Sequence, residues 1–269
     1  MVSLQEQFTA LADRRASAAI HLQTLGDFRL WRHGQEVNNK EWGRDKTLQL
    51  FEYFITTRHR KGQHKEQILD RLWPDLDGKA GEQHFKVALH GIHKVLEPER
   101  ESRQYPRYIS RIGVVYQLAP DSLWIDADAL EQYIAIGNQA AADDTALAIA
   151  AYRQAIDLYK GVFLPDRVYE DWSSEERERL QVLVMGSLIS LGELLVHDNP
   201  MECVRYCQQA LQIDHTWEDA YRLQMEAYFQ KGNRPMAMKT YQQCVHVLEE
   251  EYGIPPLPQT KRLMERILQ

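Results

Sequence analysis

The stretch QHFKVALHGIHKVL, residues 83–96, decides how the first half of the chain folds. At 100° per residue its large apolar side chains share one side of a helix, which predicts that this side faces a core. These are Phe85, Leu89, Ile92 and Leu96. The other side carries hydrogen-bond donors: Gln83, Lys86, His90, His93 and Lys94. Such a face suits a major groove, where phosphates and base edges accept hydrogen bonds, although an ordinary solvated face is the alternative.

The flanking segments predict a winged helix-turn-helix around this helix. Residues 20–37 alternate with period two and predict a small antiparallel sheet. DKTLQLFEYFITTR (45–58) and HKEQILDRLWPD (64–75) predict two further helices, the second ended by Pro74. YPRYISRIGVVYQL (105–118) alternates like a hairpin, and strands, three helices and a closing hairpin are the order of the winged form. We expect Arg107 and Arg111 of this hairpin to contact the DNA backbone, unless they are ordinary surface arginines.

The second half predicts an all-α repeat. Strand signals disappear from Trp124 onward, and Tyr206-Cys207-Gln208-Gln209-Ala210 returns 35 residues later as Tyr241-Gln242-Gln243-Cys244-Val245, near the tetratricopeptide period. Stacked helical pairs leave a groove that binds peptides or protein surfaces. The predicted fold is therefore mainly α: a helix or linker in 1–19, a winged helix in 20–118, and a tetratricopeptide-like helical domain in 119–269.

The charge of the chain divides between these halves. The net charge is −7, but residues 20–118 carry +4 and seven of the ten histidines, whereas residues 119–269 carry −11. Such asymmetry is typical of a chain in which one domain meets a polyanion. From the charge alone, a first domain that does not bind nucleic acid is almost as well supported as one that does.

Motifs for catalysis are missing from the sequence. We find no phosphate-cradling glycine loop, zinc helix, nucleophile elbow or kinase signature, and we expect no enzyme, no catalytic residue and no cofactor. Cys203, Cys207 and Cys244 are expected as buried packing residues rather than as metal ligands. Glu175, Glu176 and Glu178 are expected to form a solvated face. Without a membrane-spanning apolar run or an export signal, the predicted location is the cytoplasm, away from membranes.

From about residue 20 to 268 the chain resembles the SARP-type activators, which join an OmpR-like winged helix to a bacterial transcriptional activator domain (BTAD). The motifs of the first domain are LGDF (25–28), HGQEV (33–37), ILDRLWPD (68–75) and VALHGIHKVLEP (87–98). Those of the second are YKGVFLPD (159–166), EDWSSEERERL (170–180), EDAYRLQMEAYFQKGNRPMAMKTYQQC (218–244) and LEEEYGIPPLPQT (248–260). Each motif is weak alone, but their order and separations are specific.

The resemblance implies sequence-specific binding to double-stranded DNA, commonly to direct repeats by side-by-side protomers, and contact with RNA polymerase that raises transcription. This chain departs from the family at Lys86 and His93, where arginines are usual, and at Val115, where a glycine is usual. Lysine lacks bidentate guanine recognition and neutral histidine lacks a phosphate-binding charge, so DNA binding is expected to be weaker or pH-sensitive. Two alternatives remain: a protein-interaction adaptor that has lost DNA binding, and a regulator that senses a small ligand.

Overall fold

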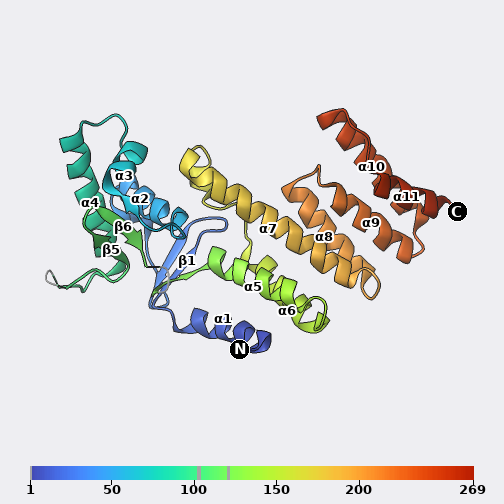
Figure 1. Ribbon diagram of the computed structural model, residues 1–269, viewed down its shortest axis with the longest axis horizontal. Coiled ribbons are helices and arrows are strands. Elements are labelled where there is room, and N and C mark those ends of the chain that lie inside the picture. The colour runs from blue at the N-terminus through green and yellow to red at the C-terminus, as the bar shows by residue number, and fades with distance from the viewer. Residues whose placement is uncertain (1, 102–103, 120–121) are drawn as a thin grey trace. The chain divides into compact units, whose positions relative to one another are not determined.

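The computed structural model describes residues 2–101, 104–119 and 122–269, and the chain forms two compact units (Figure 1). One unit, which we call the winged-helix unit, comprises Thr9–Ala129 and Leu158–Arg179. The other, the helical unit, comprises Met1–Phe8, Leu130–Asp157 and Leu180–Gln269. The division therefore does not follow a single point in the sequence near residue 118. Helices α1 (Leu4–Ser17), α5 (Asp126–Ala140) and α7 (Asp171–Leu195) each contribute residues to both units.

The winged-helix unit begins with a four-stranded sheet in the order β3-β2-β1-β7. Its strands are β1 (Ile20–Gln23), β2 (Arg29–Arg32), β3 (Gln35–Glu36) and β7 (Trp124–Ile125). His33 and Gly34, both with positive φ, form the two-residue turn between β2 and β3, as hairpin geometry requires. β7 corrects the expectation that strands end before Trp124: it pairs in parallel with β1, and two residues are too short to give a periodic signal.

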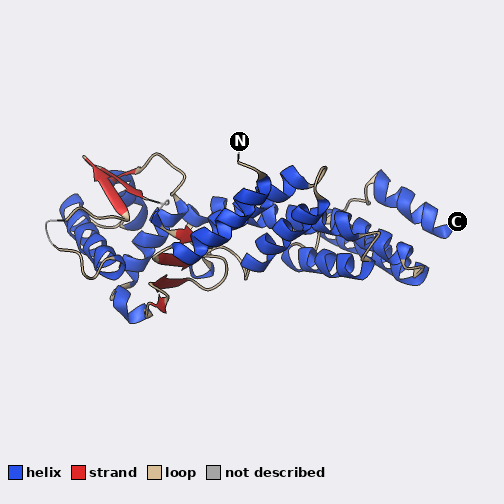
Figure 2. Cartoon of the chain, turned by 90° about the horizontal axis from the view of Figure 1, so that it is seen from below, coloured by secondary structure: helices blue, strands red, loops and turns tan. Residues whose placement is uncertain are grey.

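Three helices and a hairpin complete this unit. After a 3₁₀ turn (Asn39–Trp42) come α2 (Asp45–Thr56), α3 (Lys65–Leu72) and α4 (Gly78–Leu96). The hairpin of β5 (Ile109–Ile112) and β6 (Val115–Leu118) forms a second sheet with β4 (Gln63–His64), in the order β4-β6-β5. In Figure 2 all strands, drawn in red, belong to this part of the chain. The predicted winged helix-turn-helix is confirmed.

The core of the winged-helix unit lies between α2, α4 and the hairpin. α2 and α4 approach so closely at Gly91 that a Cβ there would lie 2.8 Å from Thr47 Cγ2. Phe85 of α4 is fully buried, with Tyr116 of β6 at 4.9 Å and Trp73 at 6.4 Å between ring centroids. Leu89, expected in the core, is only half-buried, and Ala88 and Val95 are buried. Tight packing of small against large side chains thus fixes the position of α4.

Residues 158–179 pack onto the sheet and α2 of the winged-helix unit. Gly26 N donates to Val162 O (3.0 Å) and Leu164 N donates to Thr24 O (2.9 Å), which adds main-chain pairing beside β1. A 3₁₀ turn at Pro165–Arg167 then directs Arg167 at α2. A segment that belongs to the second half by sequence motif is therefore structurally part of the winged-helix unit.

Arg58, two residues after the end of α2, is fully buried, and its contact with Glu176 corrects the expectation that the acidic run is solvated. Its guanidinium donates to Asp128 (2.5 Å) and to Glu176 (2.8 Å), and Glu176 is only 8% exposed. Glu175, which was expected to be solvated, is exposed. A buried cation requires such partners, and the partners lie some 70 and 118 residues away in sequence, where local spacing gives no signal.

The helical unit consists of antiparallel helical pairs. Its remaining helices are α6 (Thr145–Leu158), α8 (Pro200–Ile213), α9 (Glu218–Gln230), α10 (Arg234–Tyr252) and α11 (Pro258–Leu268). The repeat is visible in the caps: Asn199 accepts from Glu202 N at the start of α8, and Asn233 accepts from Met236 N at the start of α10. The predicted fold class, a winged helix followed by helical repeats, is confirmed.

The cysteines are buried inside this unit. Cys203, Cys207 and Cys244 have no exposed surface, and burial raises the pKa of the Cys244 thiol to about 12. Cys203 and Cys207 occupy the inner face of α8, where small side chains allow neighbouring helices to approach. Among the described residues, no helix combines the length and the apolar character that crossing a membrane requires.

Candidate nucleic-acid interface

α3 and α4 form the helix-turn-helix, and the residues between them fix the start of α4. The buried Ile68, Leu72 and Trp73 anchor α3 and the turn. Asp77 then caps α4 by accepting from Lys79 N (3.0 Å) and Ala80 N (2.8 Å). This cap satisfies the free amides of the first turn and sets the direction of the helix.

The outward side of α4 is a continuous exposed strip that we call the recognition face. It consists of Lys79, Gln83, Lys86, Val87, His90 and Lys94. The structure brings four of the predicted residues together here, namely Gln83, Lys86, His90 and Lys94. Sequence reasoning missed Lys79, one turn before Gln83 on the same side, and Val87, which is 47% exposed. An exposed valine among donors offers an apolar contact of the kind that a thymine methyl group takes.

Glu82 is the one acidic residue of α4, and it lies at the edge of the recognition face. Its Oε1 accepts from Lys65 Nζ of α3 (2.9 Å) and is 3.2 Å from Lys86 Nζ. The hydrogen bonds from Lys65 and Lys86 lower the pKa of Glu82, so the carboxylate stays ionised. Lys86, which is 69% exposed, therefore has an internal anion as partner, and a phosphate would compete with that anion.

His93 does not belong to the recognition face, which corrects the sequence-based placement. Its side chain is only 12% exposed, and Nδ1 lies 3.9 Å from a carboxylate oxygen of Glu97 without forming a hydrogen bond. Burial, together with the nearby charge of Arg100, lowers the pKa of His93 to about 4. The ring is therefore neutral at physiological pH. At 100° per residue His93 lies at the margin of the outward side, where neighbouring chain covers it.

The hairpin β5–β6 is the wing, and Arg111 is held in a defined position on it. Arg111 Nε donates to Gly113 O (2.8 Å), and its guanidinium lies 5.6 Å from the centre of the Tyr116 ring. Beside it at the tip, Ile112 is 81% exposed and Val114 is 44% exposed. Because Tyr116 also contacts Phe85 of α4, the wing packs against α4 through these two rings.

Arg107 is fixed through its main chain rather than its side chain. Arg107 N donates to both carboxylate oxygens of Glu97 (3.1 and 3.2 Å), while the residue itself is exposed. Glu97 thus joins the end of α4 to the segment that leads into the wing. Among the described residues, the guanidinium of Arg107 forms no hydrogen bond or ion pair.

The chemistry that this surface offers is polar and cationic. The recognition face and the wing offer lysine, arginine, glutamine and histidine donors on an exposed surface, and apolar side chains at Val87, Ile112 and Val114. Exposed donors of this kind bind phosphate and the acceptor atoms of base edges.

Comparisons with known proteins agree with this architecture. A family model described as "Bacterial transcriptional activator domain" matches residues 125–268. The solved structure of Mycobacterium tuberculosis EmbR in complex with a low affinity phosphopeptide is similar, with a TM-score of 0.80 and 17% sequence identity over 93% of this chain. The match spans 65% of the EmbR chain. No curated protein matches this chain significantly.

Proposed function

Because the chain belongs to the bacterial transcriptional activator domain family, we propose that it is a sequence-specific DNA-binding activator of transcription. The family match and the fold confirm the resemblance to SARP-type activators, and the chain is a transcription regulator of that type. This family is a class of regulators and not of enzymes. The mode of DNA binding, the contact residues and the activating role are our proposals.

The recognition face carries the proposal. α4 presents Gln83, Lys86, His90 and Lys94 on an exposed side, and its single acid is engaged by Lys65 and Lys86. A capped helix of 19 residues reaches across a major groove, with amide and imidazole groups for base edges and ammonium groups for phosphates. Lys86 and Lys94 then contribute affinity, whereas Gln83 and His90 contribute sequence preference.

The wing supplies a second contact. We propose that Arg111, which is held by Gly113 O and the Tyr116 ring, enters the minor groove or clamps the backbone beside it. Ile112 and Val114 would pack on sugar, because apolar side chains exposed to solvent at a hairpin tip gain from such burial. Arg107 extends this contact to the backbone next to α4.

The helical unit is proposed to contact protein partners, including RNA polymerase, and protomers are proposed to bind side by side on direct repeats. The support is architectural: helical repeats stacked around a continuous core present extended surfaces for proteins. Division of labour between a cationic face and an acidic repeat agrees with the charge asymmetry of the sequence.

The test is DNA binding by the purified chain. Its own upstream region is compared with a shuffled fragment of equal composition at moderate salt, by fluorescence anisotropy. We expect tighter binding to the upstream region, by at least tenfold, and weaker binding of both fragments in Lys86→Ala with Arg111→Ala. Lys239→Ala, on an exposed position of α10, is the matched control and should bind as the unmodified chain does.

Equal binding to both fragments would contradict sequence-specific recognition. Unchanged regulatory output in cells carrying Lys86→Ala with Arg111→Ala would favour the adaptor alternative instead. In that case the helical unit alone would be the working surface.

A further inference from the structure

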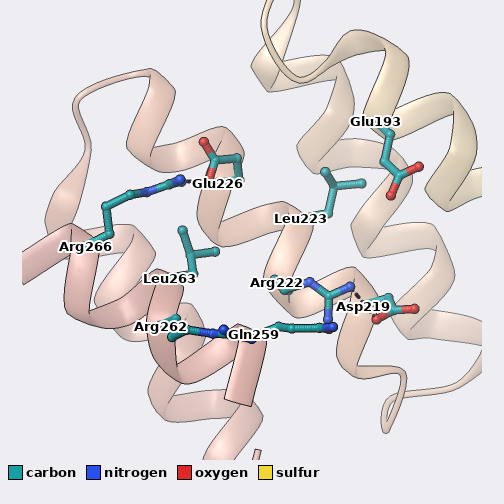
Figure 3. A pocket seen from close by; sticks show the side chains of 9 residues that line it. All are labelled: Glu193, Asp219, Arg222, Leu223, Glu226, Gln259, Arg262, Leu263 and Arg266. Atoms are coloured by element: carbon teal, nitrogen blue, oxygen red, sulfur yellow. Dashed lines mark hydrogen bonds and ion pairs between the residues drawn. The ribbon is translucent and has the colours of Figure 1, made fainter. Parts of the chain in front are cut away.

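The end of the helical unit contains a pocket of about 500 Å³ that the proposed DNA contacts do not use. It lies between α7, α9 and α11 (Figure 3). Three arginines, three acids, two leucines and a glutamine line it: Arg222, Arg262, Arg266, Glu193, Asp219, Glu226, Leu223, Leu263 and Gln259. Its volume lies within the range of about 300–1,000 Å³ that is usual for small-ligand sites.

The walls of this pocket are held by specific contacts. Glu218, in the first turn of α9, accepts from Leu257 N (2.7 Å) and from Thr260 Oγ1 (2.6 Å), and so fixes the start of α11. Ile267 is buried to 1% exposure and anchors the other end of α11. α7 meets α9 closely at Gly192, where a Cβ would lie 2.7 Å from Leu223 Cδ2. The pocket is therefore a built feature and not a gap beside a loose terminal helix.

Arg222 has a hydrogen-bond donor that no residue described by the structure satisfies. Its Nη2 donates to Asp219 (2.6 Å), but its Nη1 is buried without any partner among the described residues. Figure 3 shows this guanidinium directed at Asp219. A buried donor without an acceptor costs free energy that a bound acceptor would recover.

A second cation faces the same space. Arg262 is exposed, and its Nε donates only to the main-chain oxygen of Pro258 (3.3 Å); among the described residues it forms no ion pair. Arg266, in contrast, is engaged by Glu226 and lies over the Phe229 ring. Arg222, with its buried unpartnered Nη1, and Arg262, which forms no ion pair among the described residues, are thus the two arginines with most to gain from an added anion, and Gln259 is exposed beside them.

The balance of charges limits what the pocket accepts. Its three acids offset its three arginines, so a ligand with two negative charges would meet Glu193 and Asp219 at close range. A single carboxylate requires only the spare donors of Arg222 and Arg262, which bind a planar anion in a fork. Leu223 and Leu263 form an apolar wall for a neighbouring side chain.

We propose that this pocket binds an acidic segment of a protein partner, one carboxylate on Arg222 and Arg262 and an adjacent apolar side chain against Leu223 and Leu263. The inference deepens the partner-contact role proposed above for the helical unit and names its chemistry. The carboxylate belongs either to a glutamate or aspartate side chain or to a chain terminus, and the test distinguishes these sources.

The test titrates blocked dipeptides into the full chain and follows the Nε–Hε signals of arginine by NMR. The probes are N-acetyl-Leu-Glu-amide, its neutral analogue N-acetyl-Leu-Gln-amide, N-acetyl-Gln-Leu with a free terminal carboxylate, and inorganic phosphate. We expect saturable shifts of the Arg222 and Arg262 signals with one of the two carboxylate probes, at millimolar concentrations, and no shifts with the neutral probe.

Variants assign the effect to the pocket. Arg262→Ala, at an exposed position, should weaken binding by about tenfold or more, the loss expected for a hydrogen bond to a charged group. Arg222→Lys keeps the charge opposite Asp219 but removes the fork, and should weaken binding similarly. Arg205→Ala, on an exposed arginine of α8 outside the pocket, is the control and should bind unchanged.

The proposal would be overturned by equal shifts with the neutral probe, by binding that survives both pocket variants, or by tighter binding of phosphate than of either carboxylate. No shift with any probe would overturn it as well. Because none of these readouts involves DNA, failure here is distinguishable from failure of the DNA-binding proposal. Pocket variants should also keep the DNA affinity of the unmodified chain.

Discussion

Replacing Arg167 should destabilise the winged-helix unit more than replacing an exposed residue does. Arg167 Nε donates to Glu52 (2.6 Å) and its terminal nitrogens donate to Asp45 (2.6 and 3.2 Å). The Glu52 side chain is 1% exposed, and burial raises its pKa to about 7 in spite of the arginine. Arg167→Ala would leave that carboxyl group buried without its cation. Breaking a buried pair from one side costs about 3–5 kcal/mol.

The pH dependence of this loss follows from the sign of the Glu52 shift. Without Arg167 the pKa of Glu52 rises further above the unfolded value of 4.5, so the folded state holds a proton that the unfolded state releases. The variant therefore loses stability as pH rises, by about 1.4 kcal/mol per pH unit until Glu52 ionises. The deficit relative to the unmodified chain should be larger at pH 8 than at pH 5.5.

Urea unfolding followed by tryptophan fluorescence measures this effect. Trp217 lies in the helical unit and the other tryptophans lie in the winged-helix unit, so a Trp217→Phe background reports on the latter alone. Glu52→Gln combined with Arg167→Ala should recover most of the loss, because no buried charge remains. A loss below about 1 kcal/mol at pH 8, as for an exposed ion pair, would refute the reasoning that residues 158–179 are held on α2 by this contact.

Three further outcomes follow from the site. Lys86→Ala should weaken binding to all DNA sequences alike and reduce the salt slope of log K by about 0.9. Glu82→Gln, which releases Lys86, should strengthen DNA binding. Salt titrations measure both effects, and weaker binding by the Glu82→Gln variant would contradict the role given to the Glu82 contact. The pKa of His93 is lowered to about 4, so between pH 6.5 and 4 the unfolded chain binds a proton that the folded chain does not. The unfolding free energy of the unmodified chain should therefore fall over this pH range relative to that of His93→Gln, and unfolding at several pH values measures the difference. DNA affinity from pH 6 to 8 should not depend on His93. Gly62→Ala should lower the unfolding free energy by about 1–3 kcal/mol, because the added Cβ would lie 2.5 Å from Val115 Cγ1 at a residue whose φ is +89°. Adding Val115→Ala should restore part of the loss. Thermal melts that show no change in the Gly62→Ala variant would contradict this packing.

The helical periodicity of residues 83–96 predicted both the helix and its buried side, because burial of Phe85 and Ile92 follows directly from angle. The same angle placed His93 outward, and there the prediction was wrong. Its position at the margin of that side is decided by what covers it, namely the segment around Glu97 and Arg100. Helical periodicity gives no information about which residues outside the helix pack against it.

Contacts between segments far apart in the sequence could not be predicted either. Arg167 and Glu52 are 115 residues apart, and nothing in the local pattern of either distinguishes a buried ion pair from two solvated charges. The solvated position predicted for Glu176 is wrong for the same reason. β7, two residues long, exists because β1 offers a free edge. These features depend on tertiary context, whereas caps such as Asp77 and Asn199 follow from residue type and spacing.

Genome-wide mapping of bound sites tests the central claim, DNA recognition by the face of α4 and the wing, most directly. It compares the unmodified chain with Lys86→Ala plus Arg111→Ala and with the control Lys239→Ala. The account predicts discrete sites that share a repeated sequence, loss of those sites in the double variant, and their retention in the control. An occupancy profile without discrete sites, or one that the double variant leaves unchanged, would contradict it.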